Sequence, residues 1–347
     1  MRGSTGGGFR PTMQRLLLIG FGVALALGLL EIGLRAVGTV PEVENPLYSF
    51  HQSEPTLGWI GVPEIRQRFV REDFDALIEH TAAGFRRPDP PVPEGAPKNV
   101  LVLGDSFVWG WGVGQGEVFT DGLQRRLGSG VAVHNRGVNG FGTSQQLLLL
   151  RLELDRRQYD EVLLLFIDND FADNLSSKKG RRPYFELDGD RLVPQNQPPR
   201  RLMSPIAYFV KRSLAIAWID HRISTLVARM TRAISPPGRD EDHEETESRP
   251  TPEQVATTAA LLREMRRLCE AYGAGLTVVV AQERPARETL LEICGEEGLA
   301  CVDLLPTLSA RDDSGDLYLQ NDGHWSVAGH RAVAEALVAE GPALIRR

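Results

Sequence analysis

The sequence predicts an α/β fold in which about five parallel strands form a sheet covered by helices on both faces. Apolar runs without polar alternation, typical of strands buried on both faces, recur along the chain from residue 99 onward. Segments with the apolar spacing of helices lie between them, and strands that alternate with helices form parallel sheets. A length of 347 residues suffices for one large domain of this class with appended segments.

The elements of this domain follow one another in a regular order. The run NVLVLG is expected to be the first strand, and the helix after it places Leu123 and Leu127 on one face. Glycine-rich or polar stretches end each strand and start the next turn. The expected strands are 99–104, 131–137, 161–168, 276–281 and 299–304, and the expected helices are 120–127, 144–157, 252–273 and 326–340.

Residues 16–38 are apolar enough to cross a membrane. The uninterrupted apolar run, 16–30, is shorter than the ~20 residues that a spanning helix needs, but its continuation to Gly38 reaches that length. No Ala-x-Ala site follows, so an uncleaved anchor is favoured over a cleaved signal peptide or a buried helix of a soluble domain. Because arginines precede the segment, residues 1–15 are expected in the cytoplasm and the remainder outside. We expect a single-pass protein of the cytoplasmic membrane whose main domain, 99–347, is periplasmic or extracellular.

A segment rich in proline and glycine, 39–98, joins the anchor to the main domain. We expect an extended stalk that packs onto the domain in places, with Trp59 and Phe85 as its anchors.

A second segment, 175–250, interrupts the α/β pattern as an insertion. Asp188-Gly189 between two strand-like runs predicts a hairpin. Residues 204–230 are expected to form one or two helices that bury against the core, the membrane surface or a partner. The acidic stretch 238–250 is expected to be a solvated loop.

Composition narrows the class of protein. A net charge of −7 argues against nucleic acid as a partner, because phosphate binding needs a basic surface. None of the three cysteines has metal-site spacing, and we expect neither a metal nor a cofactor. Cys294 and Cys301 are near enough in the sequence for one disulfide in an oxidising compartment, or they are buried thiols.

Three short stretches follow the first three predicted strands. They are Gly104-Asp105-Ser106, NRGVNGFGT and DNDFADN. Because parallel strands end at one edge of a sheet, where α/β folds bind ligands, these stretches should lie close together. Ser106 is then either a nucleophile or the N-cap of the next helix.

The stretch LQNDGHWSVAGH, directly before the last helix, contains a candidate base. Side chains two residues apart in an extended segment share a face, so Asp322 could hold Nδ1 of His324 while Nε2 faces Ser106. A serine hydroxyl needs such a base to become a nucleophile. The backbone N–H groups of Ser106 and Gly140 and the side-chain amide of Asn169 are candidate donors to an oxyanion.

These blocks resemble those of the SGNH (GDSL-type) hydrolase superfamily over about residues 99–342. Ser106 matches the nucleophile and Gly140 the glycine of the second block. Asn169 matches the asparagine of the third block and His324 the histidine of the last. The resemblance implies a three-layer α/β/α, flavodoxin-like fold and ester or acyl-group chemistry without a cofactor.

Two positions depart from the pattern of that superfamily. Ile167 stands where the third block usually has a glycine. Asn321 stands three residues before the histidine, where aspartate is usual, and the carboxylate is Asp322 instead. The resulting Asp-x-His-Trp form is similar to the last block of membrane-linked polysaccharide O-acetyltransferases of the alginate type.

The expected function is serine-dependent hydrolysis of an acyl ester, with acetyl as the expected group, outside the cytoplasmic membrane. The alternative is O-acetyl transfer to an extracellular or cell-envelope polysaccharide, on which Trp109, Trp111 and Trp325 could stack unless they pack under a loop. Ile167 leaves open a non-catalytic carbohydrate-binding or assembly protein on the same fold. The expected partners are an ester or polysaccharide substrate and, through the N-terminal helix, the membrane.

Overall fold

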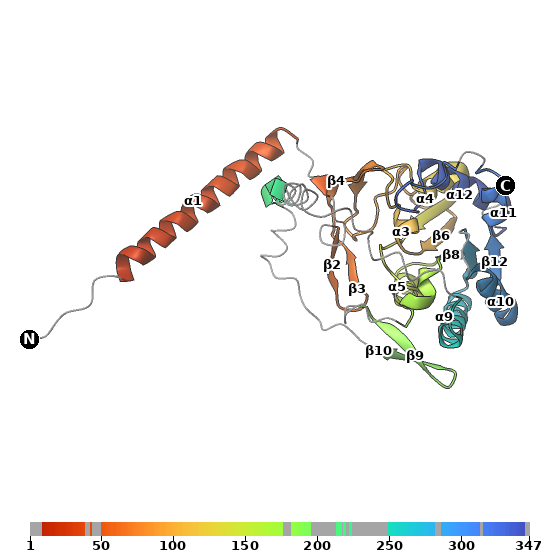
Figure 1. The fold of residues 1–347 in the computed structure, drawn as a ribbon. Helices are drawn as coiled ribbons and strands as arrows, with labels where there is room; N and C mark the ends of the chain where they lie inside the picture. Colours follow the sequence, from red (N-terminus) through yellow and green to blue (C-terminus); the bar gives the residue numbers. More distant parts are fainter. Residues whose placement is uncertain are drawn as a thin grey trace, which may run out of the picture. The chain divides into compact units, whose positions relative to one another are not determined.

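A computed structural model describes residues 9–38, 42–43, 50–175, 182–195, 213–216, 218–219, 222–223, 249–281, 286–312 and 315–343 (Figure 1). The chain divides into two compact units. One comprises Met1–Glu44 and Ser204–Gly238, and the other comprises Asn45–Met203 and Arg239–Arg347. Most of the helices expected over 204–230, and nearly all of the acidic stretch, lie outside the described residues.

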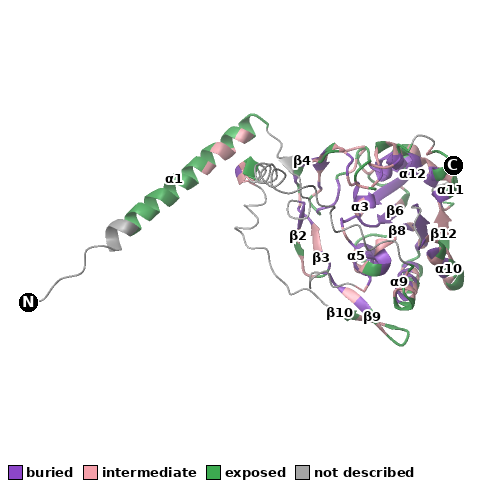
Figure 2. Cartoon of the chain, viewed as in Figure 1, coloured by how far each residue is buried: buried purple, intermediate pink, exposed green. Residues whose placement is uncertain are grey.

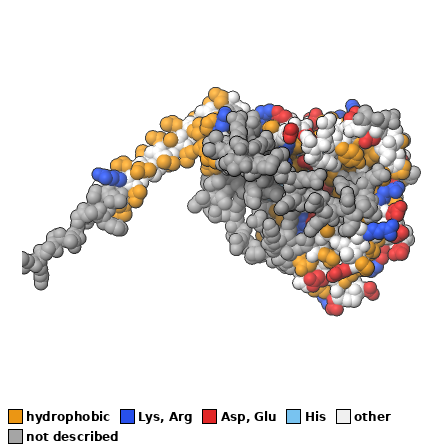
Figure 3. Space-filling model, in the orientation of Figure 1, with side chains coloured by type: hydrophobic (Ala, Val, Ile, Leu, Met, Phe, Trp, Pro, Cys, Tyr) orange, Lys and Arg blue, Asp and Glu red, His pale blue; other side chains and the backbone are white. Residues whose placement is uncertain are grey.

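The first unit contains the helix α1 (Phe9–Ala36) and the short strand β1 (Glu42–Val43). An 18-residue window within Met13–Ala36 has a mean hydropathy of 2.3 and none of it is buried, so the apolar side chains of this helix are exposed (Figures 2 and 3). The helix is long and apolar enough to cross a membrane, as an anchor or a signal sequence does. Its Glu31 carboxylate accepts hydrogen bonds from Ser213 Oγ and Ala215 N, both at 2.9 Å.

The second unit is built on a sheet of five parallel strands, which confirms the predicted fold class. The strands are β6 (Lys98–Leu103), β7 (Val131–Asn135), β8 (Glu161–Phe166), β11 (Gly275–Val280) and β12 (Ala300–Asp303), in the spatial order β12-β11-β8-β6-β7. The chain runs from β6 outward to β7 and then returns to β8 on the other side of β6. This reversal of direction is the point at which open α/β sheets bind ligands.

Helices cover both faces of the sheet and make three layers (Figure 1). Side chains alternate along β6, so Leu101 and Leu103 join one core while Val100 and Val102 join the other. The first core includes α5 (Thr143–Leu154), α9 (Pro252–Ala271) and α10 (Arg287–Glu297). The second includes α4 (Phe119–Leu127), α11 (Leu305–Ser309) and α12 (Val327–Glu340). A 3-10 turn, η1 (Gly128–Gly130), follows α4.

Residues 50–80 form two antiparallel hairpins, where the sequence suggested an extended stalk. They are β2 (His51–Glu54) with β3 (Gly58–Gly61), and β4 (Arg66–Val70) with β5 (Asp75–Glu79). Trp59 and Phe85 pack as expected. Phe85 is buried, and Trp59 Nε1 donates to the carbonyl oxygen of Asn139 at 3.0 Å. The hairpins are therefore part of the same compact unit as the sheet.

The described part of the insertion contains the predicted hairpin. Strands β9 (Tyr184–Asp188) and β10 (Arg191–Gln195) pair antiparallel, and Gly189 in their turn has φ +61°. A disulfide joins Cys294 in α10 to Cys301 in β12, while Cys269 is a buried free thiol.

Candidate active site

Ser106 begins the short helix α3 (Ser106–Trp109) three residues after β6 ends. The N-cap of this helix is Asp105, whose Oδ1 accepts a hydrogen bond from Phe107 N at 3.0 Å. The alternative in which Ser106 is the N-cap is therefore wrong, and the serine hydroxyl does not cap the helix. A side chain at Gly104 would lie 2.3 Å from Val108, so only glycine fits this turn.

The structure brings Ser106, His324 and Asp322 into one chain of hydrogen bonds. His324 Nε2 lies 2.8 Å from Ser106 Oγ, and its Nδ1 contacts Oδ1 of Asp322. Asp322 Oδ2 accepts from Trp111 Nε1 at 2.9 Å. Asn321 instead donates its backbone N–H to Asp73 at 2.6 Å. Asp322 is thus the carboxylate that meets the histidine.

Two aromatic rings fix the plane of the His324 imidazole. Phe107 stacks on it with centroids 4.6 Å apart and an interplanar angle of 27°. Trp111 stacks on it at 5.1 Å and 19°. The ring therefore has little freedom to turn away from the serine.

The three tryptophans proposed for sugar stacking differ in how far they are exposed. Trp109 and Trp325 are each 1% exposed, so a substrate has no access to them and their proposed stacking role is wrong. Trp109 Nε1 donates to Nε2 of the buried His80 at 3.2 Å. Trp111 is half-buried and contacts the histidine and the aspartate of the site.

The candidate oxyanion donors Gly140 and Asn169 follow β7 and β8, the strands that flank β6. Gly140 has φ +72°, a backbone conformation that favours glycine. The loop that carries it is joined to the turn before Ser106, because Val138 N donates to the Gly104 carbonyl at 3.2 Å. Asn169 begins the helix α6 (Asn169–Asp173).

Ile167, which stands where the third block usually has a glycine, is accommodated in an ordered turn. Its side chain is buried and its N–H donates to Asp170 Oδ2 at 3.2 Å. The buried Asp170 carboxyl therefore stabilises this turn by its hydrogen bond to the backbone.

Charge at the site is set by burial and hydrogen bonds. Burial alone would raise the pKa of Asp322, but the hydrogen bonds from His324 and Trp111 outweigh it and hold that pKa below its ordinary value. Asp322 is thus ionised at neutral pH. Burial raises the pKa of Asp105 to about 6. Burial, with the negative charge of Asp105 nearby, raises the pKa of Asp170 well above its usual range.

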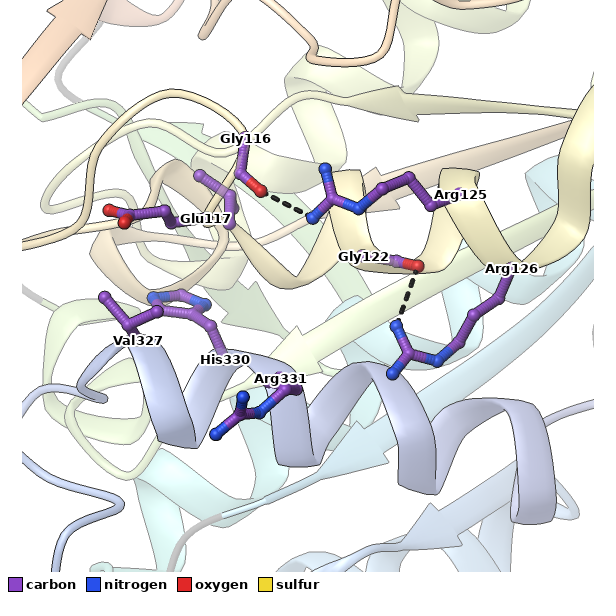
Figure 4. A pocket seen from close by; sticks show the side chains of 9 residues that line it. Gly116, Glu117, Gly122, Arg125, Arg126, Val327, His330 and Arg331 are labelled. Carbon is purple, nitrogen blue, oxygen red and sulfur yellow. Dashed lines mark hydrogen bonds between the residues drawn. The ribbon is translucent and has the colours of Figure 1, made fainter.

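A cavity of about 210 Å³ lies elsewhere in this unit, between α4 and α12 (Figure 4). Arg125, His330 and Arg331 line it, and Arg125 donates to the Gly116 carbonyl. None of the three hydrogen-bonded site residues lines this cavity. Among the described residues, no group of three or more His, Cys, Asp or Glu side chains could hold a metal ion.

A parallel α/β sheet with these residues at its carboxyl edge defines a hydrolytic enzyme of the α/β class. Residues 102–332 match the GDSL-like Lipase/Acylhydrolase family. Because the match spans more than half of the chain, the protein belongs to this family. The chain is thus a hydrolase of the GDSL, or SGNH, type.

Solved structures with a similar fold share little sequence with this chain. TesA is 15% identical over 69% of this chain and 96% of its own, with a TM-score of 0.40. A mutant of Axe2, an acetyl-xylooligosaccharide esterase from Geobacillus, is 14% identical over 73% and 98%, with a TM-score of 0.42. The psychrotrophic esterase EstA from Pseudoalteromonas is 13% identical over 69% and 94%, with a TM-score of 0.39. No curated protein sequence is significantly similar to this chain.

Sequence reasoning missed three residues that build the site, Phe107, Asp73 and Arg182, and it gave Trp111 a different role, that of stacking on a sugar. Phe107 and Trp111 pack on the histidine, Asp73 holds the loop before it, and Arg182 contacts the two segments that carry the candidate oxyanion donors. Phe107 and Trp111 are near Ser106 in the sequence, so the aromatic run after the Gly-Asp-Ser turn was a usable signal. Asp73 and Arg182 lie in segments without any motif, and only the fold brings them to the site.

Proposed function

We propose that the protein is a serine esterase that hydrolyses an acetyl or similarly small acyl ester through an acyl-serine intermediate. The observation that carries the proposal is the hydrogen-bonded series Ser106 Oγ, His324 Nε2, His324 Nδ1 and Asp322 Oδ1. In this arrangement the histidine is in place to take the serine proton, and the carboxylate is in place to stabilise the imidazolium that results.

The reaction then follows from the positions of these groups. Ser106 Oγ attacks the carbonyl carbon of the ester as its proton passes to His324 Nε2. The tetrahedral intermediate carries its negative charge on the former carbonyl oxygen, next to the N–H groups of Ser106 and Gly140 and the amide of Asn169. Its collapse breaks the bond to the alcohol, which leaves with the proton from His324. A water molecule attacks the acyl-serine in the same way and frees the acid and the serine.

A second candidate, O-acetyl transfer to a polysaccharide, rests on the Asp-x-His-Trp block. In transfer, a sugar hydroxyl replaces water in the second half of the reaction. Trp111 is the remaining tryptophan near the site that is partly accessible, and an acceptor ring could lie against its edge. The two candidates share the acyl-serine and differ only in what resolves it.

The proposed location is the outer side of the cytoplasmic membrane, with α1 as the anchor. The length and apolar surface of α1 support an anchor. The disulfide between Cys294 and Cys301 supports an oxidising compartment, because cytosolic thiols are kept reduced.

The test uses the full chain in detergent. Intact mass is measured after exposure to a fluorophosphonate, for the parent and for Ser106→Ala. Stoichiometric labelling of the parent alone is the expected result, and a folded parent that stays unlabelled would contradict the proposal. Turnover of 4-nitrophenyl acetate with and without an oligosaccharide acceptor then separates the two candidates. Acceptor-dependent release of nitrophenol favours transfer, and acceptor-independent release favours hydrolysis.

A further inference from the structure

A buried arginine from the insertion lies against two loops of the site. Arg182 precedes β9, and its side chain is 0% exposed. A guanidinium is rarely buried unless charged and polar partners satisfy it, because its desolvation is costly. Its partners therefore indicate what it holds in place.

These partners are the two loops that carry the proposed oxyanion donors. Arg182 Nη2 donates to the Gly140 carbonyl at 2.6 Å and to Asp173 Oδ2 at 2.8 Å. Its Nη1 donates to the Asp173 carbonyl at 3.2 Å and also pairs with the Asp173 carboxylate. One planar guanidinium thus connects the loop after β7 to the helix α6.

The contact of Arg182 with the Gly140 loop, together with one from Trp59, fixes the direction of the Gly140 N–H group. The Asn139 carbonyl and the Gly140 N–H belong to the same planar peptide, so holding one orients the other. Trp59 Nε1 donates to the Asn139 carbonyl at 3.0 Å, and Arg182 holds the next carbonyl, that of Gly140. The Arg182 guanidinium also lies 5.8 Å from the centre of the Trp59 ring. Both peptides that flank the Gly140 Cα are therefore held.

The contact with α6 orients the other donor. Asn169 Nδ2 donates to Asp173 Oδ2 at 3.3 Å, and the same oxygen accepts from Arg182. An amide NH2 group has two N–H donors, so this nitrogen keeps a second donor for a ligand. The position of Asp173, set by Arg182, thus decides where that second N–H points.

We infer that Arg182 is a positioning residue that holds Gly140 and Asn169 in the relative arrangement an oxyanion needs. The inference rests on the proposed function, because it assigns these two residues the task of stabilising the charge that develops on the substrate carbonyl. It adds to the site a residue from the inserted segment that contacts neither the nucleophile nor the base. Misplaced donors stabilise the transition state less while leaving ground-state binding nearly unchanged, so the loss should fall on kcat.

The test compares Arg182→Lys with the parent as full-length protein in detergent. Lysine keeps the charge but lacks the planar fork that reaches both loops at once. We expect kcat for 4-nitrophenyl acetate to fall about 10²-fold, with KM changed less than about threefold. Arg287→Lys is the matched control, since Arg287 also pairs with a carboxylate, Asp303, but touches no site residue named above. It should keep the parent kcat.

A double-mutant cycle separates positioning from general support of the fold. If Arg182 acts through Asn169, the cost of Arg182→Lys should shrink at least tenfold in an Asn169→Ala background. Equal costs in both backgrounds, or a parent-like kcat in Arg182→Lys, would overturn the inference. Failure of the proposed function looks different, because the parent itself would then show no labelling at Ser106.

If melting curves show that Arg182→Lys is unfolded, a second variant replaces it. Arg182→Met with Asp173→Asn removes both charges of the pair, so the buried arginine does not leave an unpaired carboxylate behind. A folded double variant with parent-like kcat contradicts the inference, and a loss of about 10²-fold supports it.

Discussion

Asp73, in the turn between β4 and β5, accepts a hydrogen bond from the backbone N–H of Asn321 at 2.6 Å and another from the Asn321 side chain. An N-terminal hairpin thus holds the loop that carries His324, the proposed base; the two residues in contact are 248 positions apart in the chain. The position that usually supplies the triad carboxylate is occupied by this structural contact, and Asp322 contacts the histidine instead.

Removing this contact should loosen the loop without removing any reacting group. We expect Asp73→Ala to lower kcat by about three- to tenfold, the equivalent of about 1 kcal/mol of hydrogen bonding. The control is Asp75→Ala, which breaks an ion pair with Arg68 on the same hairpin. Steady-state kinetics of both variants check the expectation. An equal loss in the two would show that only the hairpin's stability matters.

The proposal that Asp322, and not the neighbouring Asn321, supports His324 can be tested directly. Asp322→Asn should lower kcat by about 10²- to 10⁴-fold, because an amide cannot stabilise the imidazolium and permits the wrong tautomer. Asn321→Ala should cost less than about tenfold, since it removes only the side-chain contact to Asp73 and keeps the backbone hydrogen bond. If Asn321→Ala lowered kcat more than Asp322→Asn did, the assignment of the carboxylate role to Asp322 would be wrong.

Trp111 combines a stacking contact with a hydrogen bond, and the two can be separated. Trp111→Phe keeps a ring over His324 but loses the donor to Asp322. We expect a kcat loss of about three- to tenfold for Trp111→Phe and a larger loss for Trp111→Ala, which also frees the imidazole plane. If both variants keep the parent kcat, Trp111 does not help to orient His324 or Asp322.

The acid stability of the protein should depend on His80. Burial, with the positive charge of Arg86 nearby, lowers the pKa of His80 from 6.5 to about 3. Its Nδ1–H donates to the Val62 carbonyl and Nε2 accepts from Trp109. A proton added to Nε2 would therefore face the Trp109 N–H, which is a donor, and would have no hydrogen-bond acceptor. The stability that neutral His80 contributes is complete above pH 6.5 and is lost as the pH falls toward 3.

His80→Gln should therefore weaken the pH dependence of unfolding. Between pH 7 and pH 4 the parent should lose about 3 kcal/mol more stability than the variant. Denaturant unfolding at the two pH values measures the difference. The same loss in parent and variant would place the acid-sensitive group elsewhere.

The sequence was sufficient for the sheet, because buried parallel strands are continuous apolar runs, and for Ser106, Asp322 and His324, because their blocks are short and local. It was insufficient for α10, whose buried residues Leu290, Ile293 and Cys294 give only a weak helical pattern. The roles of Trp109 and Trp325 could not be predicted, since burial depends on what the fold places over a residue.

The N-terminal hairpins bear on how a soluble form of this enzyme can be made. A protein cut at residue 98, the boundary that composition suggested, would lack Asp73, Trp59 and His80. It would therefore lack the supports of the loop that carries His324, of the Gly140 peptide and of Trp109. Such a fragment would keep every block of the family and still have a poorly ordered site. Any release of the enzyme from its helix, by engineering or by a protease, has to occur ahead of residue 50 if activity is to survive.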